Sequence, residues 1–459
     1  MTEHKSRNQK ITENTKYSCL DRHGNANEST EGGKSMVSRT RAKRAGMGIL
    51  SGAILMGALA GCGSAAQSSG SKTVNLVFAT QGLGTEAQAT QQAVKEFEKL
   101  HPHIHVQIET LSASSNSAYQ TLVTDLNSGS ATPDVITSDV IWPPTFAAAK
   151  WIMPLNQFHP NMSRFYPGMV KAGEYKGKLY AIPWFINVEG VYYRTDLVKS
   201  PPKTFTQLVS DAKAAMAKNP KLIGLAFEGN KYEGAVTVFQ DVSGGFGGSF
   251  LNSKGQPVLN SPQNIRALTW LDNAIKTGLS PKAVTGWEEG NVQQAFLSGD
   301  AVFATNWPYL YPLAEQKGSA VINKVGFVPP PTQGGKPTAS LGGDDLVINK
   351  NTKYPKQAWE LVSFLTSAKT MTQRALISGD PPARTDAYTP ALLKKAPWFK
   401  QEEAVYADAT PRPVTPLYPR ISARIQEALS ATYSGQLTPK QALDQAQKAV
   451  QAIVSGHGS

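Results

Sequence analysis

The stretch that decides the fold class begins Val74-Asn75-Leu76-Val77-Phe78, an apolar run with the length and composition of a buried strand. A helix is predicted after it, because apolar residues recur at helical spacing up to Pro102. They are Ala89, Ala93, Phe97 and Leu100. Thr85 and Gln88 have the spacing of a capping box, which predicts where this helix begins.

The following residues repeat this order of elements. Ile104, Val106 and Ile108 alternate with polar residues and predict a strand with one buried face. Apolar residues within 119–126 predict a second helix, and Asp134-Val135-Ile136 predicts a third strand. Strand, helix, strand, helix, strand is typical of a parallel sheet covered by helices, so we predict an α/β fold.

Three later segments also predict regular structure. Residues 179–194 are too apolar and aromatic for a surface loop and predict one or two buried strands, in which Asn187 and Glu189 would need polar partners. A helix is predicted at 358–366. The last helix is predicted to begin at Thr438-Pro439, where a cap precedes a proline at the first helical position.

The chain before Val74 has the pattern of a secretory signal. Basic residues within 39–44 precede the uncharged run Ala45–Ala60, which ends in Leu59-Ala60-Gly61-Cys62. This tetrapeptide resembles the lipobox of bacterial lipoproteins. It implies lipidation of Cys62 and a location on the outer face of the cytoplasmic membrane. A transmembrane helix is the alternative, but 16 residues fall short of the roughly 20 needed.

Residues 1–61 are therefore predicted to be a leader and signal peptide, with translation starting at Met36, and 62–72 a flexible lipidated tether. No disulfide is expected in the mature chain, because Cys19 lies in the leader and Cys62 carries the lipid. Residues 1–61 hold ten of the 46 Lys and Arg and five of the 34 Asp and Glu, which leaves about +7 on the mature chain. These charges are scattered, so no nucleic-acid partner is expected.

The sequence contains no catalytic or metal-binding motif. Gly-x-Ser-x-Gly and His-Glu-x-x-His are absent, and adjacent pairs such as Glu288-Glu289 do not supply the two facing carboxylates of a glycosidase. His101, His103 and His105 alternate along a predicted strand, but the apolar residues between them claim its inner face. We expect these histidines to face water, and we predict no enzyme activity, metal or cofactor.

Aromatic residues stand beside polar ones at three places, 139–142, 306–309 and 411–413. A sugar presents hydroxyl groups around its ring and an apolar face, so its site needs polar side chains and an aromatic plate. The same residues could equally be core aromatics and loop charges.

At these residues the chain resembles the family 1 extracellular solute-binding proteins that deliver sugars to ABC transporters, and most closely the trehalose- and maltose-binding lipoproteins. The resemblance covers nearly all of Val74–Val454. The segments that carry it stand in the family's order: Val94–Pro102, Pro133–Val135, Gly190–Arg194, Asn306–Tyr309, Arg412–Val414 and Tyr418-Pro419.

The resemblance implies a two-lobed periplasmic-binding-protein-like α/β fold of type II, whose chain crosses between the lobes three times. We expect the crossings near residues 184–189, 301–306 and 350–356. The expected segments are, for the N-lobe, 73–185 with 303–352 and, for the C-lobe, 186–302 with 353–459.

It also implies a sugar site made by matching residues of this chain. Glu86 and Asp139 would accept hydrogen bonds from hydroxyl groups, Arg412 would donate a fork of them, and Trp307 would stack on a ring. Asn187 replaces a carboxylate expected at its position, and can both donate and accept.

Two positions depart from the family's pattern. After the Gly342-Gly343 turn the family usually has a stacking tryptophan, where this chain has Asp344. Tyr119 stands near the position of a basic contact in relatives. The carboxylate of Asp344 favours a ligand with more hydroxyl groups, or an amine, and Tyr119 is a further indication that the ligand differs from the family's usual one.

The sequence therefore predicts a monomeric, non-catalytic receptor that binds a trehalose- or maltose-like disaccharide or short oligosaccharide and delivers it to a membrane permease. An alternative keeps the scaffold but binds an amino sugar, polyol or other polar solute. A more remote alternative is a surface glycosidase that uses Glu86 and Asp139.

Overall fold

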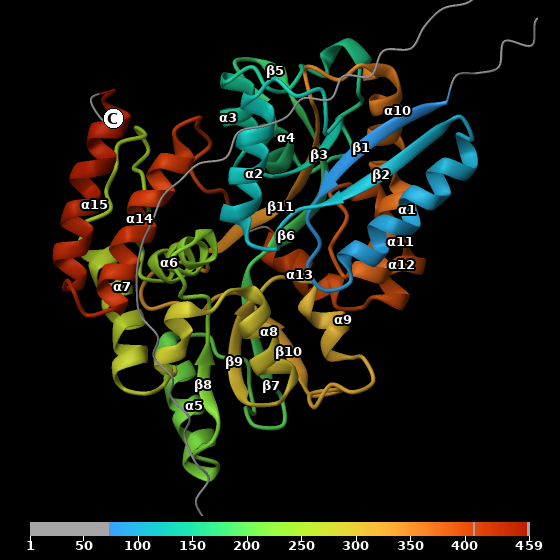
Figure 1. The fold of residues 1–459 in the computed structure, drawn as a ribbon. Helices are drawn as coiled ribbons and strands as arrows, with labels where there is room; N and C mark the ends of the chain where they lie inside the picture. The colour runs from blue at the N-terminus through green and yellow to red at the C-terminus, as the bar shows by residue number, and fades with distance from the viewer. Residues whose placement is uncertain (1–72, 407–408, 457–459) are drawn as a thin grey trace, which may run out of the picture. The chain divides into compact units, whose positions relative to one another are not determined.

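The first sheet contains the strands predicted at the start of the chain (Figure 1). A computed structural model describes residues 73–406 and 409–456, which lie in one compact unit, Ser69–Ser459. Strand β1 (Val74–Thr80) runs parallel to β2 (Ile104–Thr110) and β3 (Val135–Asp139), as predicted. The predicted signal peptide, lipobox and tether lie outside the described residues.

Three further strands make this sheet mixed. Strand β11 (Ala339–Ile348) runs antiparallel to both β3 and β6 (Ala181–Val188), and parallel to β12 (Ala409–Thr410). The sequence predicts a buried strand at β6, and every residue of β6 is buried. Position 139 at the end of β3 and the middle of β11 are thereby brought side by side.

Helices cover both faces of the first sheet. On one face, α1 (Glu86–Leu100), α10 (Pro355–Leu365) and α11 (Ala368–Ser378) pack in a core around Phe78 and Trp184. The other face is covered by α2 (Ser115–Asn127), whose Leu122 packs with residues of β3 and β11. Shorter elements on this part of the chain are α3 (Pro143–Ala148), η1 (Asn156–Phe158), α4 (Pro167–Ala172), β4 (Glu174–Tyr175) and β5 (Lys178–Leu179).

The second sheet has the strand order β10-β7-β9-β8 and is also mixed. Its strands are β10 (Val325–Val328), β7 (Gly190–Arg194), β9 (Ala301–Asn306) and β8 (Ile223–Ala226). Strand β7 runs antiparallel to both of its neighbours, whereas β8 and β9 are parallel.

The helices around the second sheet come from distant parts of the chain. The first group is α5 (Phe205–Lys218), α6 (Glu233–Gly245), α7 (Pro262–Lys276), η2 (Lys282–Gly286), α8 (Glu289–Leu297) and α9 (Leu310–Ala314). The C-terminal helices α14 (Tyr418–Tyr433) and α15 (Pro439–Val454), drawn in red, pack in the same core beside α6 and α7 (Figure 1). Between the two groups lie η3 (Thr385–Ala387), α12 (Pro390–Lys395) and α13 (Phe399–Tyr406).

The chain passes from the first sheet to the second at Glu189, within the first predicted crossing, because β6 pairs with β11 and β7 pairs with β9. Two other placements differ from the predicted lobe segments. Strand β10 lies in the second sheet although 303–352 were assigned to the N-lobe. Helix α10 packs on the first sheet although 353–459 were assigned to the C-lobe. Apolar periodicity shows which helix face is buried, but not which sheet covers it.

The two predicted capping boxes have different outcomes. Thr438 accepts a hydrogen bond from the backbone N–H of Gln441 and begins α15, which confirms the prediction. Thr85 precedes α1 but makes no cap; its hydroxyl donates to the carbonyl oxygen of Ile377, 2.8 Å away. The capping-box prediction for Thr85 is therefore wrong, because a tertiary partner takes its side chain.

The described part of the chain has no helix that is both long enough and apolar enough to span a membrane. Of the three alternating histidines, His103 and His105 are exposed as predicted, and His101 stacks on Phe97 with ring centroids 4.4 Å apart. Within residues 73–406 and 409–456, no group of His, Cys, Asp and Glu is arranged to hold a metal ion.

Candidate functional site

A polar pocket of about 630 Å³ collects most of the residues that the resemblance selects. Its lining includes Glu86, Asp139, Asn187, Trp307, Gly343, Asp344 and Arg412. Tyr119 does not line this pocket. It lines a neighbouring pocket of about 490 Å³, and both pockets contact Ser115 and Glu233.

Strand ends and helix starts hold these side chains in place. Asp139 ends β3, and Asp344 of β11 is its register partner, so their side chains belong to one row of the first sheet. Asn187 of β6 is paired with Gly342 on the other side of β11. Glu86 is the first residue of α1, and its Oε2 accepts a hydrogen bond of 2.7 Å from the backbone N–H of Leu83.

The two glycines before Asp344 are required by close packing. A Cβ on Gly342 would lie 2.7 Å from the ring of Trp307. Gly343 has a φ of 103°, a left-handed conformation that favours glycine, and a Cβ there would meet the carbonyl oxygen of Phe185. Both glycines lie within strand β11, so the expected turn is wrong; they let β11 approach both β6 and the indole ring.

Arg412 is engaged by carboxylates of this protein. Its Nη1 donates to Glu233 Oε1 at 2.9 Å, and its Nη2 donates to Asp139 Oδ1 and to the Leu341 carbonyl oxygen, both at 3.2 Å. Burial by itself lowers the pKa of the Arg412 guanidinium. The negative charges of Asp139 and Glu233 raise this pKa by more than burial lowers it, so it lies above the ordinary value. The resemblance predicts that the guanidinium of Arg412 donates to a sugar. Both of its Nη atoms already donate to groups of the protein, and only its Nε lacks a partner among the described residues.

Glu233 is a central residue of the pocket that the sequence did not reveal. It begins α6, and beyond Arg412 it accepts hydrogen bonds from the hydroxyl groups of Tyr418 and Ser422 in α14. Its backbone N–H donates to Asn116 Oδ1 of α2 at 3.3 Å. Glu233 is not part of a recognisable sequence motif. An acidic residue beside an aromatic one, Tyr232, was the local feature that could have suggested a sugar contact.

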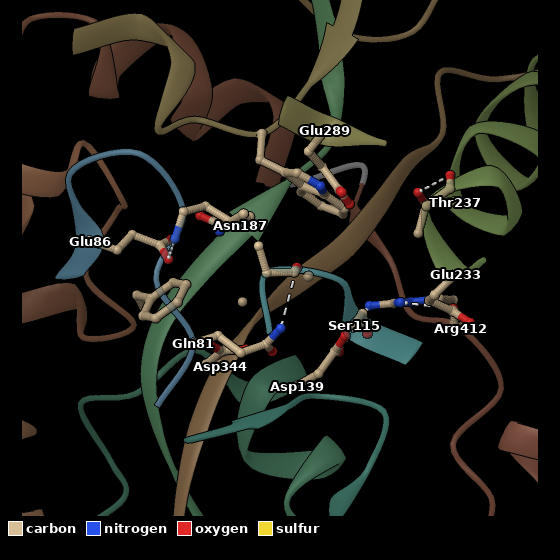
Figure 2. Close-up of a pocket in the computed structure, with 17 residues that line it drawn as sticks. Gln81, Glu86, Ser115, Asp139, Asn187, Glu233, Thr237, Glu289, Asp344 and Arg412 are labelled. Carbon is tan, nitrogen blue, oxygen red and sulfur yellow. Dashed lines mark hydrogen bonds and ion pairs between the residues drawn. The ribbon is translucent and has the colours of Figure 1, made fainter. Parts of the chain in front are cut away.

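Other lining residues missing from the prediction are Gln81, Ser115, Phe185, Thr237 and Glu289. Figure 2 shows Gln81, Glu86 and Asp344 on one side of the pocket and Thr237, Glu233 and Arg412 on the other. Burial raises the pKa of Glu289, at the start of α8, to about 7. Trp307 and Phe185 supply the apolar part of the lining.

Two lining side chains remain without a protein partner. Asp344 makes no side-chain hydrogen bond within residues 73–406 and 409–456, and burial raises its pKa well above the ordinary value, with Asp139 as the next cause. Asn187 is 7% exposed, and its Oδ1 is buried without a donor in the described part of the chain. Buried polar atoms normally have partners, so the unpartnered oxygen of Asn187, with the partly exposed Asp344 carboxylate in the same pocket, indicates where a ligand would bind.

Comparisons with known proteins agree with this architecture. Residues 82–372 match the family model described as bacterial extracellular solute-binding protein. The chain is 30% identical over 410 residues to a probable ABC transporter-binding protein of Deinococcus radiodurans, covering 86% of this chain and 96% of that one. It is 26% identical over 320 residues to a maltotriose-binding protein of Pyrococcus abyssi, covering 68% and 67%.

Among solved structures, the maltose-bound MalE3 of T. maritima superimposes with a TM-score of 0.80 at 30% identity, over 83% of this chain and all of that one. The two mixed sheets are thus those of the α/β periplasmic-binding-protein fold. The chain belongs to the bacterial extracellular solute-binding proteins, the non-catalytic family whose members bind solutes outside the cytoplasm for ABC transporters.

Proposed function

We propose that this protein captures a disaccharide or short oligosaccharide of the trehalose or maltose type and delivers it to an ABC permease. The observation that carries the proposal is the pocket itself, where the indole of Trp307 lies beside carboxylate and amide groups. This is the combination that a sugar ring and its hydroxyl groups require. A maltose-bound structure and a maltotriose-binding protein among the relatives support the same ligand class.

Capture would couple to transport through closure of two lobes around the pocket. Glu86, Asp139, Asn187 and Asp344 would contact the ligand from the first sheet, and Trp307 from the loop after β9. A ligand that binds the closed arrangement better shifts the population toward it, and the permease would engage that form. Because the family is non-catalytic, the glycosidase alternative is wrong.

A lipid on Cys62 would keep the receptor at the outer face of the cytoplasmic membrane. The basis is the lipobox-like Leu59-Ala60-Gly61-Cys62 behind an uncharged run and a basic segment. In the native host we expect the wild-type protein in the membrane fraction. A Cys62→Ser variant should remain unlipidated, and mass spectrometry of the N-terminal peptide would show this directly.

Isothermal titration calorimetry with trehalose, maltose, sucrose and maltotriose tests the sugar assignment. We expect at least one of them to bind, and Trp307→Ala to weaken its binding by about 10-fold or more, since a stacked ring is a large part of such a contact. Trp359→Ala is the matched control, because Trp359 stacks on Phe158 at 4.9 Å and does not line the pocket. Binding to none of these sugars, or equal losses in both variants, would contradict the proposal.

A further inference from the structure

The lining of the pocket holds more acidic side chains than cationic ones. Five carboxylates line it, from Glu86, Asp139, Glu233, Glu289 and Asp344, against the single guanidinium of Arg412. That guanidinium already pairs with Asp139 and Glu233. Three carboxylates are left without a cationic partner in the lining.

A further cation, Arg374, lies behind the wall of the pocket, over the ring of the lining residue Phe185. Its Cζ sits 4.0 Å from the ring centroid of Phe185, and its Nη1 pairs with Asp380 at 2.9 Å. Arg374 and Asp380 are 3% and 0% exposed in their side chains, so this pair is sealed. Asp380 therefore offsets most of the charge that Arg374 could offer to the pocket.

The polar groups of the pocket are also short of free donors. The side-chain amide of Gln81 donates to the Ser112 carbonyl oxygen at 2.8 Å, and the Thr237 hydroxyl donates to the Gly234 carbonyl oxygen at 2.8 Å. Besides Nε of Arg412, the unpartnered atoms of the lining include two acceptors: Oδ1 of Asn187 and the carboxylate of Asp344, which accepts no hydrogen bond from the described residues. A site rich in acceptors and in negative charge matches a group that only donates.

Asn187 is a second indication of a ligand, independent of the acidic side chains of the lining. It is neutral, more than nine-tenths buried, and lines the same pocket from the neighbouring strand β6. Across the β6–β11 pairing, Asn187 lies opposite Gly342, two residues before Asp344 in β11. Its unpartnered oxygen and the Asp344 carboxylate therefore come from adjacent strands at one end of the pocket.

We propose that the ligand is an amino sugar, whose protonated amino group is held by Asp344 and Asn187 with Glu86 adding to the negative field. This inference rests on the proposed capture of carbohydrate and specifies its chemical class. An ammonium supplies three N–H donors to the free acceptors and neutralises one of the unpaired carboxylates. A neutral sugar can donate hydroxyl hydrogen bonds to these acceptors, but it brings no charge that pairs with a carboxylate.

Calorimetry with matched neutral and cationic disaccharides tests the class of ligand. One pair is trehalose and its 2-amino-2-deoxy form; the other is cellobiose and the fully deacetylated glucosamine disaccharide, with N,N′-diacetylchitobiose as a neutral ligand of similar bulk. We expect the amine to bind roughly 10- to 100-fold tighter than its neutral partner in at least one pair. Neutral sugars that bind as tightly in both pairs would overturn the inference and leave sugar capture standing. No binding by any member would overturn the inference, and the titrations with maltose, sucrose and maltotriose would then decide whether sugar capture stands.

Two variants locate the amine. Asp344→Asn keeps the shape of the side chain and removes its charge, so the preference for the amine over its neutral partner should fall to about 3-fold or less. Asp300→Asn is the control, because Asp300 is exposed and outside the lining, and it removes the same charge. A preference that survives Asp344→Asn, or that falls equally in both variants, would overturn the assignment to Asp344. Thermal unfolding curves of the variants verify folding.

Discussion

At the scale of single residues, the surroundings of Glu189 explain why a polar residue lies in so apolar a stretch. Glu189 is 1% exposed, and its Oε2 has no hydrogen-bond partner among the described residues. Burial, followed by the charge of Glu289, raises its pKa from 4.5 to about 8, while Thr237 and Arg412 act in the opposite direction. The side chain is therefore protonated in the folded protein at pH values where it ionises in the unfolded chain.

This difference predicts a pH dependence of stability. Between about pH 5 and pH 8 the folded state holds a proton at Glu189 that the unfolded state has lost, so stability falls as the pH rises through this window. We expect the free energy of unfolding to decrease by roughly 3 to 4 kcal/mol over this window through Glu189. Urea unfolding at pH 5, 6.5 and 8 measures this change.

A Glu189→Gln variant keeps the shape of the side chain and removes its titration. Its free energy of unfolding should vary less with pH than that of the wild type. A remaining slope is expected from Glu289, whose pKa is raised to about 7. The idea fails if the two proteins show the same pH profile.

For other residues of the site, the sequence predicts which positions belong to it but not which side chains contact each other. The family resemblance selects Asp139 and Arg412, but it does not reveal that they pair with each other, because the two lie far apart in the chain. Glu233 is missed for the same reason, since its partners Tyr418 and Ser422 come from α14. Local sequence carries no signal for contacts of this range.

At the scale of elements, the sequence predicts best where periodicity and capping agree. The parallel strands β1, β2 and β3, the helix α10 and the start of α15 all follow from apolar spacing and cap residues. The sequence did not predict that β10 belongs to the second sheet or that α10 packs on the first, because a helix or strand with one apolar face can pack on either sheet. The boundaries of the two lobes accordingly remain a prediction.

The N-terminal cap of α15 gives a test at this scale. Thr438 and Gln441 each accept a hydrogen bond from the other's backbone N–H, which satisfies two donors that the helix itself cannot. Replacing Thr438 with alanine should lower the free energy of unfolding by about 1 kcal/mol. Thr121→Ala is the control, because Thr121 is exposed in the middle of α2, where its hydroxyl only donates to the carbonyl oxygen of Ser117. That variant should change stability by about 0.5 kcal/mol or less; equal losses in urea unfolding would argue against a cap.

At the scale of the whole molecule, several polar contacts join the two sheet systems, and those of Arg412 lie in the wall of the pocket. Arg412 links Asp139 of β3 in the first sheet to Glu233 of α6, which packs with the second. Asn116 of α2 adds to this link, since it contacts the backbone of Glu233 and donates to Gln426 of α14 at 2.9 Å. These contacts are made by the protein's own side chains, so they stabilise the arrangement in which the pocket is assembled.

Replacing Arg412 should therefore weaken binding even of a ligand that never touches it. In Arg412→Gln the carboxylates of Asp139 and Glu233 lose their shared partner and repel each other, so the assembled pocket becomes less populated. If its population falls about 10-fold, the apparent affinity for a neutral disaccharide falls by the same factor. Arg384→Gln is the control, because Arg384 pairs with Asp386 outside the pocket. Calorimetry gives the affinities, and small-angle scattering should show that Arg412→Gln is more expanded than the control without ligand and contracts more when sugar is added. Unchanged affinity and scattering in Arg412→Gln would show that the contacts of Arg412 do not control assembly of the pocket.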